Sequence, residues 1–320
     1  MVADIGSIAF GLALVLFFAG RLVQGTLAFA RGFGLSAFVV SVLFLGFDPE
    51  NLAVGAVGTY EGAPGIAMGT IVGSAMVAIA LAFGVTALIV PLRFEQAPRS
   101  ILVVPIMAMA LVGLLAWDGE LSRVDGLVLL TGYLIGILYL VWLSRRGVDI
   151  QGAGLGKKTE KAEGLTTFKA VGLLLISLAM IVAGSELLVR GARDLIEQFG
   201  LSQTLIGMTV IALAISIEEI ARELPAAWKG HPEIAFGNVA GSVLAFFLFN
   251  AGIIALIRPL PIDAATANFY LPVAAGTVVL ISALLLLRRV PRWAGALLVA
   301  VYIGFAVGGY ALFGASPATR

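Results

Sequence analysis

The chain of 320 residues contains no cysteine, a single histidine and only 12% charged residues. The absence of cysteine excludes disulfides, thiolate metal sites and cysteine nucleophiles, and it leaves the redox compartment open. The shortage of charge accompanies a mean hydropathy of +1.07. Such a composition indicates a chain whose surroundings are mostly lipid.

Apolar runs long enough to cross the hydrocarbon core, which is about 30 Å thick, occur about ten times. Their unbroken character favours helices, because the strands of a barrel would alternate apolar and polar residues. The predicted fold class is therefore an all-α polytopic membrane protein with about ten transmembrane helices. The expected spans are 6–30, 35–58, 64–91, 101–117, 124–144, 168–190, 202–228, 232–257, 268–287 and 293–314.

Basic residues are unevenly divided between the two sets of loops that ten spans create. One set holds twelve lysines and arginines, and the other holds five. Because basic loops resist translocation, we expect the richer set in the cytoplasm and both termini outside, in a cell (plasma) membrane. The segment 144–167 is then a cytoplasmic linker, and its basic charge leaves a regulatory or lipid-binding role open.

The sequences on the two sides of this linker resemble each other. LVQGTLAFARGFGLS from Leu22 aligns with LVRGARDLIEQFGLS from Leu188, and GAPGIAMGTIVGS from Gly62 aligns with GHPEIAFGNVAGS from Gly230. Five spans lie on each side, and an odd number forces equivalent segments to cross the membrane in opposite directions. The predicted domains are two inverted five-helix repeats, 1–143 and 168–320, a plan on which many secondary transporters place a midplane substrate site.

Several carboxylates fall inside the expected spans, at corresponding places in the two repeats. An ionised side chain at the centre of a span costs about 2.5 to 3.5 kcal/mol, so it usually faces a cavity, a partner or an ion. Pro49 interrupts helical hydrogen bonding, and the freed carbonyls are tolerated only where they line protein or water. With hydroxyls and amides from 69–75 and 237–243, these groups predict a hard oxygen site for Ca²⁺, Na⁺ or H⁺. The carboxylates are Asp48, Glu50, Glu218, Glu219 and Glu223.

The segment from Gly200 to Ser242 contains GMTVIALAISIEE followed by GNVAGS. It resembles the alpha repeats of the calcium/cation antiporter superfamily, of the sodium/calcium exchanger type, in which G-T-S-x-P-E precedes G-N-x-x-G-S-N. The first repeat resembles them less closely, and together the two cover most of the chain. The resemblance implies a secondary active antiporter that exchanges Ca²⁺ or a similar cation for Na⁺ or H⁺ by alternating access. Inorganic cations would be its substrates and membrane lipid its surroundings, with no cofactor.

The resemblance also implies particular cation ligands. In the family the glutamate precedes the serine of G-S by 23 positions, which gives Glu219 from Ser242 and Asn51 from Ser74. Pro49, in the place of the family's proline, favours Glu50 instead. We therefore expect Glu50 and Glu219 as the metal ligands, with Asn51 as the alternative in the first repeat. The full expected cation-binding set is Asp48, Glu50, Asn51, Ser74, Ser216, Glu218, Glu219 and Ser242.

The sequence departs from the family pattern at several ligand positions. Arg222 follows Glu218 by four residues, the spacing of an ion pair on one helix face, and such a cation would weaken a divalent site. These departures leave two alternatives, a monovalent cation/proton antiporter and a membrane subunit that no longer transports. The positions where the family has an oxygen ligand and this chain has an apolar residue are Phe47, Ala78, Ile215 and Phe246.

Other classes of protein find less support in the sequence. An enzyme is not expected, because the single histidine, His231, lies in a predicted loop and no H-E-x-x-H motif is present. A channel would share the acidic midplane, but the inverted repeat favours an antiporter. The sequence has no phosphate-binding loop and no nucleic-acid patch, so we expect an ion gradient to supply the energy and no nucleic acid to bind. No feature indicates an oligomeric state.

Overall fold

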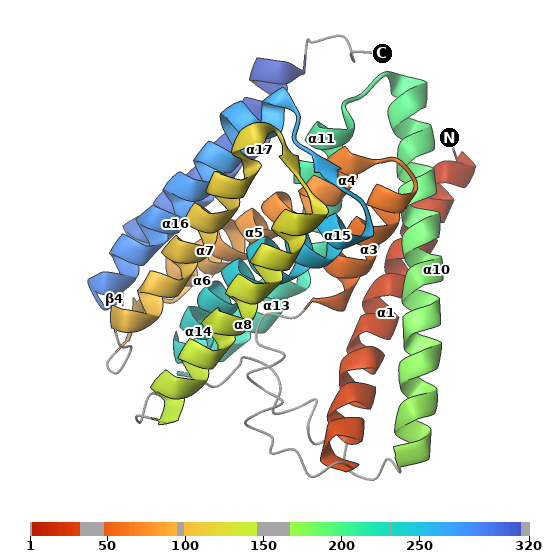
Figure 1. Ribbon diagram of the computed structural model, residues 1–320. Helices are drawn as coiled ribbons and strands as arrows, with labels where there is room; N and C mark the ends of the chain where they lie inside the picture. Colours follow the sequence, from red (N-terminus) through yellow and green to blue (C-terminus); the bar gives the residue numbers. More distant parts are fainter. Residues whose placement is uncertain (1, 33–47, 95–98, 146–166, 231, 315–320) are drawn as a thin grey trace.

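The computed structural model describes residues 2–32, 48–94, 99–145, 167–230 and 232–314. Helices make up nearly all of these ranges (Figure 1), which confirms the predicted all-α membrane fold. Eight helices in the described ranges are long and apolar enough to cross a membrane, and a shorter apolar helix covers Val103–Asp118. Part of the expected span 35–58, most of the linker 144–167 and His231 lie outside the described residues.

The first half begins with the long helix α1, and its centre is a continuous rod from residue 64 to residue 89 in which α-helical turns alternate with π-helical turns. The elements are α1 Val2–Gly32, α3 Pro49–Tyr60, α4 Pro64–Met68, η1 Gly69–Gly73, α5 Ser74–Met76, η2 Val77–Ala82, α6 Phe83–Ile89, β1 Leu92–Arg93, η3 Arg99–Leu102, α7 Val103–Leu115, η4 Ala116–Asp118, β2 Glu120–Leu121 and α8 Arg123–Arg145.

The second half repeats this order. Its elements are α10 Thr167–Phe199, α11 Gln203–Ile206, η5 Gly207–Ile211, α12 Ala212–Ser216, α13 Glu218–Trp228, α14 Pro232–Leu244, η6 Ala245–Asn250, α15 Ala251–Ile257, β3 Leu260–Pro261, η7 Thr266–Tyr270, α16 Leu271–Leu286, β4 Arg289–Val290 and α17 Arg292–Phe313.

Helix α10 extends to Phe199, past the expected end of its span at residue 190. Its charged last turns stay helical because Arg190 pairs with Glu186 and Arg193 lies 3.6 Å from Glu197, both one helical turn away.

Two short antiparallel strand pairs show how the halves are related. Leu92 of β1 pairs with Val290 of β4, and Leu260 of β3 pairs with Leu121 of β2. Since 92 + 168 = 260 and 121 + 169 = 290, exchanging the halves converts one pair into the other. Helix packing follows the same exchange, with α6 against α17 and α8 against α15. The division into two inverted repeats, 1–143 and 168–320, stays a prediction.

The rod of residues 64–89 runs through the middle of the molecule, while α1 and α10 lie together at one side (Figure 1). Close approach at the centre depends on glycine: a Cβ on Gly69 would lie 2.2 Å from the carbonyl carbon and oxygen of Gly207. Gly69 and Gly73 form a G-x-x-x-G sequence, and small residues at this spacing let two helices approach closely. This contact brings η1 and η5, one from each half, together at the centre of the protein.

Candidate cation site

A helix starts at almost the same repeat position in both halves, at Pro49 in the first and at Glu218 in the second. Helix α3 starts at Pro49, and Asp48 before it is extended, with φ −116° and ψ 92°. In the second half Ile217 separates α12 from α13, and 49 + 168 = 217. The first turns of both helices contain carboxylates. The N-terminal end of a helix carries partial positive charge and unpaired N–H groups, so it favours anions there.

The first repeat contributes a neutral group of oxygens. Ser74 Oγ donates a hydrogen bond to Asn51 Oδ1 at 2.6 Å, and Asn51 Nδ2 donates to Ser216 Oγ at 3.4 Å. All three side chains are at most 1% exposed. The hairpin formed by α3 and α4 brings Asn51 and Ser74 together, while Ser216 arrives from the break in the second half. An amide and two hydroxyls of this kind can bind a cation without adding charge.

The second repeat contributes an acidic group at the equivalent place. Asn238 Nδ2 donates hydrogen bonds to Glu219 Oε2 and Glu223 Oε1, both at 2.6 Å. Glu219 and Glu223 lie one turn apart on α13, and Asn238 lies on α14. Hydrogen bonds to charged acceptors are stronger than neutral ones, so this bridge fixes both carboxylates. Ser242 is fully buried, and its Oγ has no hydrogen-bond partner among the described residues.

A third group joins the two breaks. Carboxylate oxygens of Asp48, Glu50 and Glu218 all lie within 4.8 Å of one another. Asp48 and Glu50 are 2% exposed. Two like charges at this separation repel by roughly 3 kcal/mol at an effective dielectric constant of 20, so such a cluster favours a cation bound among its oxygens. Asp48 and Glu50 come from the first repeat and Glu218 from the second, so this group lies where the two repeats meet.

The structure groups most of the predicted residues, with Asn51 rather than Glu50 beside Ser74. Which of them bind metal stays a prediction. Asn51 is the side chain that bonds Ser74, while Glu50 faces Asp48 and Glu218. Positions follow the repeat: Asn51 corresponds to Glu219 and Glu50 corresponds to Glu218, because 51 + 168 = 219 and 50 + 168 = 218. This geometry favours Asn51 over Glu50 as the first-repeat counterpart of Glu219. The side chain of Arg222, expected beside Glu218, lies outside those described.

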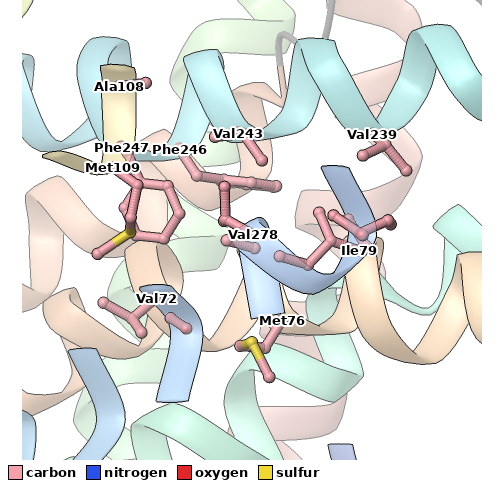
Figure 2. Packing of buried hydrophobic residues seen from close by; sticks show 14 of the residues in the cluster. Val72, Met76, Ile79, Ala108, Met109, Val239, Val243, Phe246, Phe247 and Val278 are labelled. Atoms are coloured by element: carbon pink, nitrogen blue, oxygen red, sulfur yellow. The ribbon is translucent and has the colours of Figure 1, made fainter. Parts of the chain in front are cut away.

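The apolar departures from the family pattern lie in the core. Ala78, Ile215 and Phe246 are completely buried, and Phe47 lies outside the described residues. Figure 2 shows Phe246 and Phe247 packed among Met109, Val72 and Val278 in this cluster. At the positions of Ala78 and Phe246 the chain thus has packing groups in place of oxygen ligands.

Two residues of the site were absent from the predicted ligand set. Asn238 is the asparagine of the G-N-x-x-G-S motif, and Glu223 follows Glu219 by one helical turn. The G-N-x-x-G-S motif could have indicated Asn238, and the four-residue spacing from Glu219 could have indicated Glu223. The sequence could not show that one amide would bridge the two carboxylates.

The fold defines a helical integral membrane protein in which buried oxygen-bearing side chains from both halves lie together. A family model described as "Sodium/calcium exchanger protein" matches residues 4–142 and 169–310. The chain belongs to this family, which agrees with the resemblance of its alpha repeats.

Individual relatives agree with this assignment. CaxA of Alkalimonas amylolytica, which its name describes as a candidate antiporter, is 30% identical over 302 residues, 92% of this chain and 95% of that protein. The sodium/calcium exchanger MaX1 of Methanosarcina acetivorans is 31% identical over 144 residues, 43% of this chain and 40% of MaX1. A solved structure of the sodium-calcium exchanger NCX_Mj has a TM-score of 0.61 at 26% identity, covering 96% of this chain and 98% of that one.

Proposed function

We propose that the protein is a secondary active antiporter that exchanges Ca²⁺ or a similar cation for Na⁺ or H⁺ by alternating access. Membership of the sodium/calcium exchanger family supports this activity. The observation that carries it is the presence of two buried oxygen groups, Asn51–Ser74 and Glu219–Asn238–Glu223, built on the equivalent positions Asn51 and Glu219 in the first turns of α3 and α13. Ion binding and rocking of the two halves involve no covalent chemistry, so no enzymatic activity and no cofactor are part of the proposal.

The roles of the two groups follow from their charge. Calcium takes carboxylates and neutral oxygens together, and its affinity rises with the number of charged ligands. Glu219 and Glu223 supply that charge, and Asn238 holds them in position. Asn51, Ser74 and Ser216 supply neutral oxygens on the opposite side. Asp48, Glu50 and Glu218 link the two breaks and add negative charge near the path of the cation.

The orientation in the membrane is part of the same proposal. The excess of basic residues in one set of loops supports a cytoplasmic linker 144–167 and termini outside, in the plasma membrane. In that orientation the turn between α3 and α4 faces outward, and the turn between α13 and α14 faces the cytoplasm.

A monovalent cation/proton antiporter is the second candidate. The neutral Asn51 and the apolar Ala78 and Phe246 favour it, because each removes an oxygen or a charge that a divalent cation would use. Neither candidate requires a nucleic-acid partner, and inorganic cations are the substrates of both.

Flux into proteoliposomes tests the proposal. Radioactive calcium is supplied outside vesicles that contain the purified protein, with either a sodium gradient or a proton gradient imposed. Gradient-dependent uptake that disappears in the Glu219→Gln variant would support Ca²⁺ exchange and identify the counter-ion. No uptake under either gradient would overturn Ca²⁺ exchange and leave a monovalent exchanger or a non-transporting subunit.

A further inference from the structure

Asn250, the last residue of η6, is a buried amide outside the groups described above. It is completely buried, and neither its Oδ1 nor its Nδ2 has a hydrogen-bond partner within the described ranges. It lies in the apolar span Ala235–Ile257. A buried amide without a partner is costly, so native structures usually satisfy such a group with an ion, a water or another side chain.

The direction of Asn250 follows from its neighbours on the same helix. Phe249 packs its ring 5.0 Å from that of Tyr133 on α8, and a Cβ on Gly252 would lie 2.9 Å from Leu130 on α8. Asn250 is two residues before Gly252, which is about 200° around a helix. It therefore lies on the side turned away from α8.

The same side of the helix contacts the first repeat. Ile254 lies one turn after Asn250, and a Cβ on Gly55 would lie 2.5 Å from Ile254 Cδ1 and 2.4 Å from Thr70 Oγ1. Gly55 of α3, Thr70 of η1 and Ile254 of α15 thus form one layer of contacts. The layer joins three helices from both halves.

One turn deeper, the same three helices bring Asn51, Ser74 and Asn250 to one level. Helix α15 runs in the direction of α3, because β3, which follows α15, contacts α4 at the end of the α3–α4 turn. Moving one turn away from that end leads from Gly55 to Asn51 and along the returning rod from Thr70 to Ser74. On the third helix it leads from Ile254 to Asn250. Both α3 and α5, which starts at Ser74, contact η6.

We propose that Asn250 is a ligand of a monovalent-cation site, which it forms with Asn51 and Ser74. This inference rests on the proposed antiport and assigns its counter-ion to a site of neutral oxygens. Asn51 Oδ1 accepts one bond from Ser74 and keeps a second lone pair, and Asn250 Oδ1 adds another oxygen. The ligands are uncharged, which suits Na⁺ better than Ca²⁺. Asp48 and Glu50 add carboxyl oxygens at the start of α3, the helix that carries Asn51.

Asn250 also explains how the chain functions with phenylalanine at the family's ligand position. Phe246 precedes Asn250 by four residues on the same span and packs in the apolar cluster (Figure 2). The amide stands one turn further along, and the π-helical form of η6 shifts the face on which it emerges. Short π-helical segments of this kind occur often at functional sites.

Thermal unfolding of the purified full-length protein tests the site. The melting temperature is measured as NaCl replaces choline chloride, and separately as CaCl₂ is added. For Asn250→Leu, in which an apolar group of similar size replaces the amide, we expect the Na⁺ concentration for half-maximal stabilisation to rise by roughly tenfold or more. The Ca²⁺ concentration for half-maximal stabilisation should change by no more than about twofold. Ser177→Ala removes a different buried polar group, a hydroxyl on α10 without a partner among the described residues, and should leave both half-maximal concentrations unchanged.

The outcomes separate this inference from the proposed antiport. Unchanged Na⁺ stabilisation in Asn250→Leu, or an equal weakening of Na⁺ and Ca²⁺, would overturn the monovalent site even if the natural protein exchanges Ca²⁺ in vesicles. Absence of Ca²⁺ uptake by the natural protein would overturn the antiport while the Na⁺ binding remains measurable. If Asn250→Leu does not fold, Asn250→Asp replaces it. The added charge should then lower the half-maximal Na⁺ concentration, and no shift would also overturn the site.

Discussion

The two repeats place different chemistry at equivalent positions. In the first repeat Asn51, Gly55 and Thr70 occupy the positions that Glu219, Glu223 and Asn238 occupy in the second, each 168 residues later. The first group contains no charge, whereas the second contains two carboxylates that share one amide. The two repeats thus share a backbone arrangement, but the carboxylates of these equivalent positions occur only in the second repeat.

This difference indicates that the fold and the ion ligands are separable. The start of α3 at Pro49, the break at Ile217 and the strand pairs lie at equivalent positions of the two halves, although the residues that line the site differ. A cation between the halves then lies closer to charge on one side than on the other. An unequal site of this kind can favour a divalent cation on the acidic side and a monovalent one on the neutral side.

Removing the charge of Glu219 should have the largest effect. For Glu219→Gln we expect Ca²⁺ uptake in proteoliposomes to fall by roughly 100-fold, about 3 kcal/mol, because the variant removes a buried charged ligand. Asn51→Gln, at the equivalent position, keeps a neutral amide and should reduce uptake by less than about tenfold. Equal losses in the two variants would mean that the repeats contribute equally, and the contrast drawn above would be wrong.

Removing the shared amide should have the next largest effect. Asn238→Ala removes both hydrogen bonds to Glu219 and Glu223, and we expect the half-saturating Ca²⁺ concentration to rise by about 10- to 100-fold. The matched control is Thr70→Ala, since 70 + 168 = 238 and Thr70 donates only to the backbone carbonyl of Ala67 at 2.8 Å. Thr70→Ala should shift the concentration by less than about threefold. A similar shift in both variants would assign Asn238 a packing role only.

Adding a negative charge to the first repeat should strengthen Ca²⁺ binding and so make the two repeats more alike. Asn51→Asp places a carboxylate beside Ser74, opposite Glu219, and we expect the half-saturating Ca²⁺ concentration to fall by about tenfold. The measurement is Ca²⁺ uptake over a range of external concentrations. Weaker Ca²⁺ binding would contradict the assignment of Asn51 as the counterpart of Glu219, because the new charge would then face the Asp48–Glu50–Glu218 cluster.

Much of the architecture could be predicted from the sequence, because unbroken apolar runs and a matching pair of segments on either side of a basic linker have direct physical meanings. The positions of the site followed from Pro49 and from carboxylates that the membrane would otherwise exclude. The choice between Glu50 and Asn51 could not be predicted, because adjacent residues on α3 point about 100° apart and spacing alone does not reveal which one faces Ser74. The role proposed for Asn250 could not be predicted, because a single amide in an apolar run has no recognisable pattern.

The smallest effect is expected for the charged residues in the turns after α3 and α13. Glu61 follows α3 and lies 3.5 Å from Arg190 and 4.0 Å from Arg193 on α10, whereas the equivalent Lys229 after α13 forms no ion pair with a described residue. Because these side chains are partly exposed, Glu61→Gln should cost no more than about 1 kcal/mol, and less at high salt. A melting temperature lowered by a few degrees at most would agree, with Lys229→Gln as the control without a shift. A large decrease in melting temperature that added salt does not reduce would contradict this expectation. It would show that the ion pairs of Glu61 stabilise the packing of α10 on the first repeat more than their exposure implies.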